Sequence, residues 1–340
     1  MNFLPSDEQA QIVDTLKAFL TAQAPVARFR PPAPQVGNAD GRFWPQLAAL
    51  GYLGIALADE HGGIGLTAVE EMLVYREFGR HLLSPAVLGI TLAVHMAAQA
   101  SHAALDSLLS GHVGVALANP LSAVTLGPTS SGDFHLIDAG QAAWVLACDP
   151  AGAALFRGDR FSDHAVVSGT DSVLMLQRAK LTAAVPDLWL ASRDYPLHRR
   201  AQLLIGAYAV GMAEATRDMA VEYAKARHQF GKPIGSFQAI KHICADMAIR
   251  TEAALCQVIH AALVDAEGLA GADFHGIAGK LVSTAAALQN AAQNIQVHGA
   301  IGFTAETDAH LYLKRSHVME QLWGNTRELR ERMLEADFPD

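Results

Sequence analysis

Residues 227–241 read RHQFGKPIGSFQAIK and join two long helical segments in the last third of the chain. The glycine and proline content predicts a fixed loop, with Arg227 at the end of one helix and Gln238 at the start of the next. An arginine fork matches phosphate oxygens with paired hydrogen bonds, and the N–H groups at a helix start favour an anion. Phe230 offers a flat face to an adenine or flavin ring. The segment therefore indicates nucleotide binding; a helix–loop–helix turn with a solvated Arg227 is the alternative.

The sequence changes character twice along its length. Residues 1–110 carry helical stripes of apolar side chains, residues 111–195 carry short apolar runs separated by turn residues, and residues 196–340 are helical again. This pattern predicts an N-terminal helical domain, a small middle β domain and a C-terminal helical domain. The order argues against a Rossmann enzyme, a TIM barrel or an α/β hydrolase, because those folds alternate strand and helix.

Local signals predict where several elements begin and end. Ser6 and Thr67 are expected N-caps, and Gly51 is an expected helix terminator. The strand-like runs are 113–118, 134–137, 143–148 and 173–176. The C-terminal helices are expected over about 199–227, 237–267 and 274–297, and from about 307 onward.

Composition limits the classes of function. Hydrophobic residues make up 51% of the 340 residues and charged residues 17%, so the chain can bury a sizeable core. The net charge of -9 argues against a broad basic face for nucleic acid. No sequence pattern for a metal site is present.

The chain is expected to be cytoplasmic, with no membrane span. Its acidic N-terminus lacks the basic region of a signal peptide. The longest apolar stretch, residues 85–100, is short for a membrane span and is better explained as a buried helix. Cys148, Cys244 and Cys256 have no paired spacing, which predicts buried thiols in a reducing compartment.

Three motifs in the same order give the chain a family resemblance. Residues 227–238 closely resemble the acyl-CoA dehydrogenase signature R-x-[QT]-F-G-x-x-[IL]-x-x-F-Q. Residues 44–65 resemble the N-terminal helical region of that family, and residues 296–304, QVHGAIGFT, look like its Q-x-x-G-G-x-G segment. The resemblance implies an α+β multidomain fold: an N-terminal helical domain, a small middle β-barrel or sandwich, and a C-terminal four-helix bundle.

The resemblance also implies FAD as the cofactor, bound across a subunit interface. The residues that match the cofactor contacts of the family are Arg227, Gln229, Phe230, Gln238, Gln296, His298, Gly299 and Ala300. Ala300 replaces the second glycine of the usual pair, which makes close approach of the backbone to the pyrophosphate less certain there. His298 is equally compatible with a neutral side chain that packs the helix end.

The catalytic position of the family holds no acid here. The base is usually a Glu in a Y-E-G-T-type segment, and the matching residues 321–326 read QLWGNT, which places Trp323 at the base position. An indole N–H only donates, so it cannot accept the α-proton of an acyl thioester. Some members carry the Glu on the first long C-terminal helix, where this chain has Ala201. Glu320 is a weak candidate, and no catalytic residue is assigned.

The part of the β domain that holds the flavin ring also departs from the family. Residues 115–120, VALANP, resemble the start of a T-E-P-x-x-G-S-D-like loop without its G-S-D part. Residues 143–146, AWVL, resemble a W-I-[TS]-like strand without its polar contact. The resemblance therefore covers the C-terminal half of the cofactor site better than the half around the ring.

This asymmetry favours a heteromeric enzyme of the α2β2 kind known from bacterial steroid side-chain degradation. A full-length homologue would supply the base and the ring pocket, the substrate would be a bulky acyl-CoA, and an electron-transfer flavoprotein would be the acceptor. One alternative is a self-sufficient homo-oligomeric dehydrogenase with a displaced base such as Glu320. Another is a non-enzymatic structural homologue.

Overall fold

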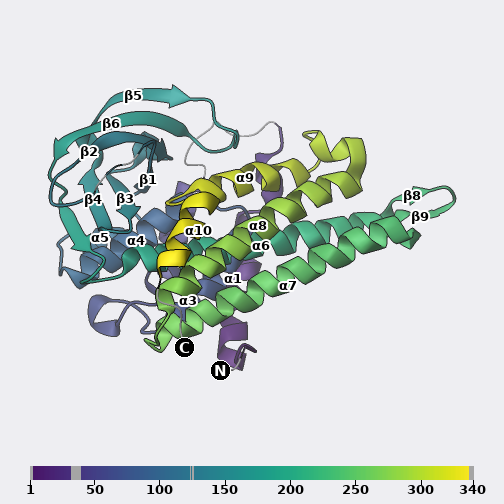
Figure 1. Ribbon diagram of the computed structural model, residues 1–340, viewed down its shortest axis with the longest axis horizontal. Coiled ribbons are helices and arrows are strands. Elements are labelled where there is room, and N and C mark those ends of the chain that lie inside the picture. Colours follow the sequence, from purple (N-terminus) through teal and green to yellow (C-terminus); the bar gives the residue numbers. More distant parts are fainter. Residues whose placement is uncertain (1–2, 32–39, 123, 125, 337–340) are drawn as a thin grey trace.

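A computed structural model describes residues 3–31, 40–122, 124 and 126–336, and confirms the helical, β, helical order (Figure 1). The N-terminal helices are α1 (Asp7–Gln23), α2 (Trp44–Ala49), α3 (Ala68–Arg80), α4 (Ala86–Gln99) and α5 (Leu105–Leu109). The C-terminal helices are α6 (Leu197–Ala226), α7 (Gln238–Ala266), α8 (Ala272–His298), α9 (Ala309–Gln321) and α10 (Thr326–Glu335). The helix bounds expected from the sequence agree closely, except that the last segment divides into α9 and α10.

The predicted helix ends carry the expected interactions. Ser6 and Gln9 form a reciprocal capping box at the start of α1, and Thr67 and Glu70 form one at the start of α3. Gly51 follows α2 with a φ of +81°, a left-handed conformation that glycine adopts without a Cβ penalty. These ends are local features, which is why the sequence predicts them.

The strands form one seven-stranded mixed sheet with the order β5-β6-β2-β1-β3-β4-β7. The strands are β1 (Val115–Pro120), β2 (Ser130–Ile137), β3 (Trp144–Asp149), β4 (Gly152–Arg157), β5 (Phe161–Val167), β6 (Leu176–Ala184) and β7 (Leu188–Ala191). The β1–β3 pair is parallel, and the other neighbours are antiparallel. Figure 1 shows the sheet as a strongly curved layer at one end of the molecule.

The strand expected over 173–176 is wrong, because this segment turns into β6, which begins at Leu176. The sequence also missed β4, β5 and β7. Beyond Phe161, β5 is exposed along its length, so it shows no alternation of buried and exposed residues. It is held by pairing with β6 at the edge of the sheet, an interaction that periodicity does not reveal.

Both faces of the central strands are buried. Leu117 lies beside Leu146 in the β1–β3 register, and both belong to the large core shared with the helices. Their neighbours Ala118 and Ala147 lie on the opposite face, in a separate core within the curved sheet that includes Phe156. The sheet therefore separates two cores.

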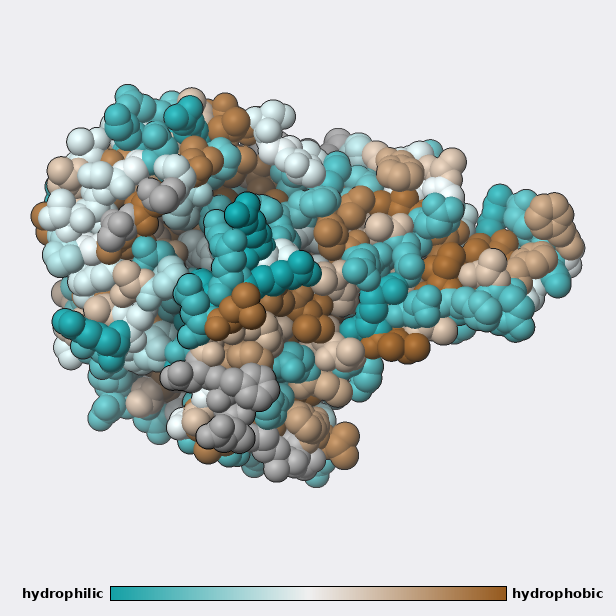
Figure 2. Space-filling view, in the orientation of Figure 1, coloured by the Kyte–Doolittle hydropathy of each residue, from teal (hydrophilic) through white to brown (hydrophobic). Residues whose placement is uncertain are grey.

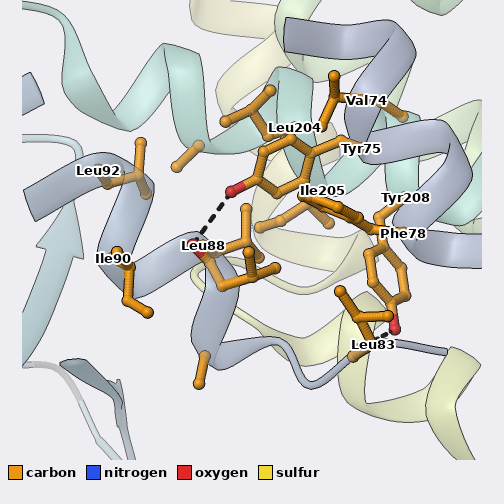
Figure 3. Packing of buried hydrophobic residues seen from close by; sticks show 14 of the residues in the cluster. Val74, Tyr75, Phe78, Leu83, Leu88, Ile90, Leu92, Leu204, Ile205 and Tyr208 are labelled. Atoms are coloured by element: carbon orange, nitrogen blue, oxygen red, sulfur yellow. Dashed lines mark hydrogen bonds between the residues drawn. The ribbon is translucent and has the colours of Figure 1, made fainter. Parts of the chain in front are cut away.

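Helices α3, α4 and α6 meet in the helical core. Figure 3 shows Tyr75 and Tyr208 packed among aliphatic side chains, with the Tyr75 hydroxyl donating to the Val87 carbonyl oxygen at 3.1 Å. A Cβ added at Gly79 would lie 1.9 Å from the Tyr208 carbonyl oxygen, so α3 and α6 require glycine where they cross.

The predicted burial of the apolar 85–100 segment is confirmed, because α4 is buried along almost its whole length. Among the described residues, one helix, α7, has the length and hydropathy to cross a membrane. Met247, Ala254 and Val258 on its inner face are buried, and α7 packs against α6 and α8. Interior helices of globular proteins share these properties, so the observation is weak support for a membrane segment.

The predicted burial of all three thiols is only partly correct. Cys148 is buried in β3, where burial raises the pKa of its thiol, whereas Cys244 is half-buried and Cys256 is exposed on α7. Both helical cysteines lie on α7, which is covered on its inner face alone.

A buried ion pair joins the three parts of the chain. Arg315 on α9 donates from Nε to Asp171 in the loop between β5 and β6, at 2.5 Å. Its Nη1 donates to the Leu83 carbonyl oxygen after α3 and to the Tyr208 hydroxyl on α6, each at 2.8 Å. One guanidinium thus ties the sheet to both sets of helices.

Replacing Arg315 by Met should lower the free energy of unfolding by about 3–5 kcal/mol, because it leaves the Asp171 carboxylate buried without its partner. Urea denaturation measures the change. The matched control is Arg327→Met, which removes the exposed Arg327–Glu331 pair and should leave stability almost unchanged. Equal effects of the two variants would contradict the role given to the buried pair.

Candidate functional site

The signature segment forms a hairpin that projects from the end of the helical bundle (Figure 1). After α6 ends at Ala226, the short strands β8 (His228–Gln229) and β9 (Lys232–Pro233) pair antiparallel. The N–H of Ile234 donates to the Arg227 carbonyl oxygen at 2.8 Å and closes the loop before α7. Phe230 sits at the tip with a φ of +52°, and 91% of its surface is exposed.

The second motif lies at the same end of the bundle. The His298 ring, at the end of α8, stacks on the Tyr223 ring of α6 with a centroid distance of 4.2 Å. His298 Nδ1 lies 2.8 Å from the Asn294 carbonyl oxygen, so the packing interpretation of this histidine has direct support. Val297 completes a small core with Ala224 of α6 and Met247 of α7. The tertiary structure thus gathers residues 227–238 and 296–300 at one end.

Most of the residues expected to contact FAD are free to accept a ligand. Arg227, Gln229, Gln238 and Gln296 are exposed, and within the described part of the chain their side chains have no recorded hydrogen-bond partner. Gly299 and Ala300 are also exposed, and a Cβ at Gly299 would meet no atom within 4 Å. This donor set, with the small residues beside it, fits the diphosphate half of a dinucleotide.

The sequence interpretation missed a second cation on the projecting hairpin and its flanking residues, 227–238, which we call the arm. Lys232 Nζ lies 4.4 Å from the centre of the Phe237 ring, and Phe230 meets that ring edge-on with a centroid distance of 6.2 Å. Lys241 is exposed near the start of α7, whereas the exposed Lys225 near the end of α6 is paired with Glu222 at 2.8 Å. The hairpin and the start of α7 therefore carry the exposed cations Arg227, Lys232 and Lys241, although the chain as a whole is acidic.

The opposite side of the expected site is closed by Trp323. The side chain is buried, and its indole N–H donates to the Ala118 carbonyl oxygen of β1 at 2.9 Å. Its backbone N–H donates to Asn119 Oδ1 at 2.8 Å, and its carbonyl oxygen accepts from Gln202 Nε2 at 2.9 Å. The residue that the sequence predicts at the base position is thus buried in a hydrogen-bonded wall between the sheet and the bundle.

A buried lysine lies beneath this wall. Lys280 on α8 donates from Nζ to the Leu322 and Gly324 carbonyl oxygens, at 2.5 and 2.7 Å. Burial lowers the pKa of Lys280 to about 7, even though Glu320 nearby favours the charged form. The neighbouring His198 on α6 is also buried, and burial with Arg332 and Lys280 close by lowers the pKa of His198 to about 3.

Neither alternative position supplies a base. Ala201 is fully buried, and the adjacent Arg200 forms ion pairs with Glu71 and Asp265. Glu320 Oε1 accepts from the Thr326 N–H at 2.7 Å, at the start of α10.

The protonation of Glu320 follows from these contacts. Burial disfavours its charged form, but hydrogen bonds from Thr326 and Gln321 outweigh this effect and lower the pKa of Glu320. It is thus a weak base held in a structural contact.

Two cavities lie beside the 321–323 segment and share Asn119 and Gln321 in their walls. One, of about 250 Å³, lies between β2 and α9, and its lining combines aliphatic residues such as Ile137 and Val318 with polar ones such as His135 and Thr170. The other, of about 600 Å³, lies between the ends of β1 and β3 and helix α10. Its charged lining residues are Asp149, Glu328, Glu331, Arg332 and Glu335.

This side does not fit an anionic dinucleotide well. Carboxylates outnumber cations around the larger cavity, so a phosphate would be repelled there. Trp144, the expected remnant of a ring contact, instead stacks under Arg157 at 4.2 Å, and the cavity between β1 and α10 is built without it. The residues present fit one half of the FAD site.

His198→Leu should make the free energy of unfolding less dependent on pH below about pH 6.5. The unfolded chain takes up a proton on this imidazole below pH about 6.5, whereas the folded chain does so only near pH 3, so the free energy of unfolding falls as the pH drops through this range. Between pH 6.5 and pH 4.5, the variant should lose less stability than the parent by on the order of 2 kcal/mol. Urea denaturation at each pH is the measurement, and the exposed His242→Leu variant should keep the parental slope. Identical slopes for His198→Leu and the parent would refute this prediction.

Comparison with known proteins places both helical parts in one family. Residues 6–107 match the acyl-CoA dehydrogenase N-terminal domain, and residues 198–336 match the acyl-CoA dehydrogenase C-terminal domain. Acyl-CoA dehydrogenase IpdE2 of Mycobacterium tuberculosis is 30% identical over 335 residues, which cover 97% of each chain. Acyl-CoA dehydrogenase FadE34 of the same organism is 36% identical over 85% of this chain, but the match spans 41% of FadE34.

Solved structures show the same fold. The ChsE4–ChsE5 complex from Mycobacterium tuberculosis matches with a TM-score of 0.84 at 22% identity and covers 100% of each chain. A Tcur3481–Tcur3483 steroid ACAD variant matches with a TM-score of 0.85 at 22% identity and covers 97% of each chain. Because the domain matches span most of the sequence and IpdE2 aligns along nearly all of it, this chain belongs to the acyl-CoA dehydrogenase family.

Proposed function

We propose that this chain is the FAD-binding, base-free subunit of a heteromeric acyl-CoA dehydrogenase. In this reaction class a base removes the α-proton of an acyl-CoA thioester while FAD takes the β-hydride. The chain would contribute Arg227, Gln229 and Gln238 to an FAD seated mainly in a full-length partner. The partner would supply the catalytic carboxylate and the pocket for the flavin ring.

The observation that carries the proposal is the difference between the two halves of the site. On the arm, Arg227, Gln229 and Gln238 are exposed, and among the described residues their side chains have no hydrogen-bond or ion-pair partner, which leaves them available to a ligand. In the cleft, Trp323 stands where the sequence predicts the base position, and both of its N–H groups are already bonded to Ala118 of β1 and to Asn119. A group that only donates, and that is already engaged, cannot act as the base.

Exposed apolar side chains on the arm support a partner chain. Figure 2 shows apolar patches interspersed with hydrophilic surface along the bundle and at the hairpin tip. Ile249 on α7 and Val282 on α8 are exposed, as are Phe230 and Phe303. Exposed apolar patches are typical of protein interfaces, and the similar ChsE4 and ChsE5 chains form a complex.

One similar solved structure supports the proposal of a bulky substrate. One similar structure is a steroid ACAD, which supports an acyl-CoA with a large ring system, such as a steroid side-chain thioester. An electron-transfer flavoprotein is the proposed acceptor, as the family resemblance implies.

Co-expression with a full-length homologue encoded nearby tests the proposal. We expect a heteromer that contains FAD and oxidises a steroid acyl-CoA, whereas this chain alone should be inactive. Arg227→Met should weaken FAD binding in the heteromer by about ten- to a hundred-fold, because a charge-assisted contact to a phosphate is lost. Arg330→Met, an exposed site on α10, is the matched control and should leave FAD binding unchanged.

Two results would overturn the proposal. Stoichiometric FAD and turnover in the chain alone would show a self-sufficient enzyme. A complex without flavin absorbance would indicate a structural homologue.

The self-sufficient alternative makes a separate prediction about Glu320. If Glu320 is structural, as its bond to the Thr326 N–H indicates, Glu320→Gln should leave turnover of the complex within about two-fold of the parent. Steady-state kinetics with the acyl-CoA measure this. Abolished turnover with FAD content unchanged would instead identify Glu320 as the displaced base.

A further inference from the structure

The Lys280 side chain holds both peptide groups around Trp323. Its Nζ reaches the carbonyl oxygens of Leu322 and Gly324, the residues on either side, while the side chain itself is fully buried. No carboxylate is recorded within hydrogen-bond distance of Nζ in the described part of the chain. The backbone carbonyls are therefore what compensates for the buried amine.

The backbone that Lys280 holds is strained. Trp323 has a φ of +52° and Gly324 a φ of +117°. A bulky residue in the left-handed region costs on the order of 1–2 kcal/mol and persists where the surroundings enforce it. The contacts that enforce it are the two bonds from Lys280 and the bonds of Trp323 to Ala118, Asn119 and Gln202.

The strained segment lies between two cavities. Asn119 and Gln321 line both the 250 Å³ cavity beside β2 and the 600 Å³ cavity beside α10, whereas Leu322 lines only the smaller cavity and Trp323 only the larger one. The indole of Trp323 donates to the Ala118 carbonyl oxygen of β1, which fixes it on the side of the larger cavity.

We propose that Lys280 is a positioning residue that fixes Trp323 as a plug between the two cavities. Lys280 acts through the backbone, because both of its acceptors are main-chain carbonyls. Among the contacts just named, the indole bond to Ala118 alone depends on the side chain at position 323, and the other four are made to main-chain atoms of the loop. The plug is a property of this chain alone and does not depend on FAD or on a partner.

The charged and titratable groups that face Lys280 come from three helices: His198 on α6, Glu320 on α9, and Glu328 and Arg332 on α10. His198 and Glu320 have lowered pKa values, so neither changes its charge near neutral pH. Near pH 7 the lysine passes from an ammonium to an amine, and its bonds to the carbonyls lose their charge assistance. The two hydrogen bonds from Lys280 should therefore weaken as the pH rises, and the loop should then hold Trp323 less firmly.

Acrylamide quenching of the Trp323 fluorescence tests the positioning role. The Trp323 signal is obtained as the difference between the full-length chain and its Trp323→Phe variant. In the parent, quenching should increase between about pH 5.5 and about pH 8.5, with a midpoint near 7. Lys280→Met should raise quenching about two- to five-fold at low pH and abolish the pH step, because the side chain keeps its length but cannot donate. Lys314→Met on α9, which removes only a 3.4 Å contact to Ser172, is the control and should keep the step. A pH step that persists in Lys280→Met overturns the proposal.

A second measurement covers the case in which Lys280→Met does not fold. Trp323→Gly should open a space the size of an indole, and free indole at about 1 mM should bind there and raise the Tm. If Lys280 shapes the loop, this rescue should be largely lost in Trp323→Gly combined with Lys280→Leu, whose side chain cannot donate, and kept when it is combined with Lys314→Met. Equal rescue in both double variants would show that Lys280 does not position the plug.

Discussion

The arrangement of the three parts depends on the buried guanidinium of Arg315. A buried charge is tolerated only when it is paired and hydrogen-bonded, and Arg315 satisfies this with Asp171, two main-chain oxygens and the Tyr208 hydroxyl. Because these groups come from the loop between β5 and β6, from the turn after α3 and from α6, the bonds that satisfy the charge also hold the three parts together. The relative positions of the cleft and the projecting arm depend on how these three parts are held together.

The two halves of the expected cofactor site illustrate opposite uses of polar groups. On the arm, Arg227 and Gln238 remain hydrated, so leaving them unpaired costs little and they are free to bind. In the cleft, the polar groups of Trp323 and Lys280 are buried, and each hydrogen bond they make removes a desolvation cost. The first set suits a ligand shared with another chain, and the second holds this chain together.

The failures of the sequence predictions have specific physical causes. The strand expected over 173–176 lies in a segment whose Asp171 is drawn to Arg315, a residue 144 positions away. The exposed strand β5 shows no periodicity because pairing alone holds it at the sheet edge. Cys256 is exposed because one face of α7 is left uncovered within this chain.

The sequence by itself determined the helix caps, the long C-terminal helices, the family and the lack of a carboxylate at position 323. Each of these depends on neighbouring residues or on a contiguous motif, as with Ser6 and Gln9 at the start of α1. Only the tertiary structure decided that Trp323 is a wall rather than an open pocket residue, and that Lys280 lies beneath it. The indole of Trp323 bonds to Ala118, 205 positions earlier, and burial lowers the pKa of Lys280 through contacts from several helices. Burial and long-range hydrogen bonds arise only when distant segments pack together, so no local pattern encodes them.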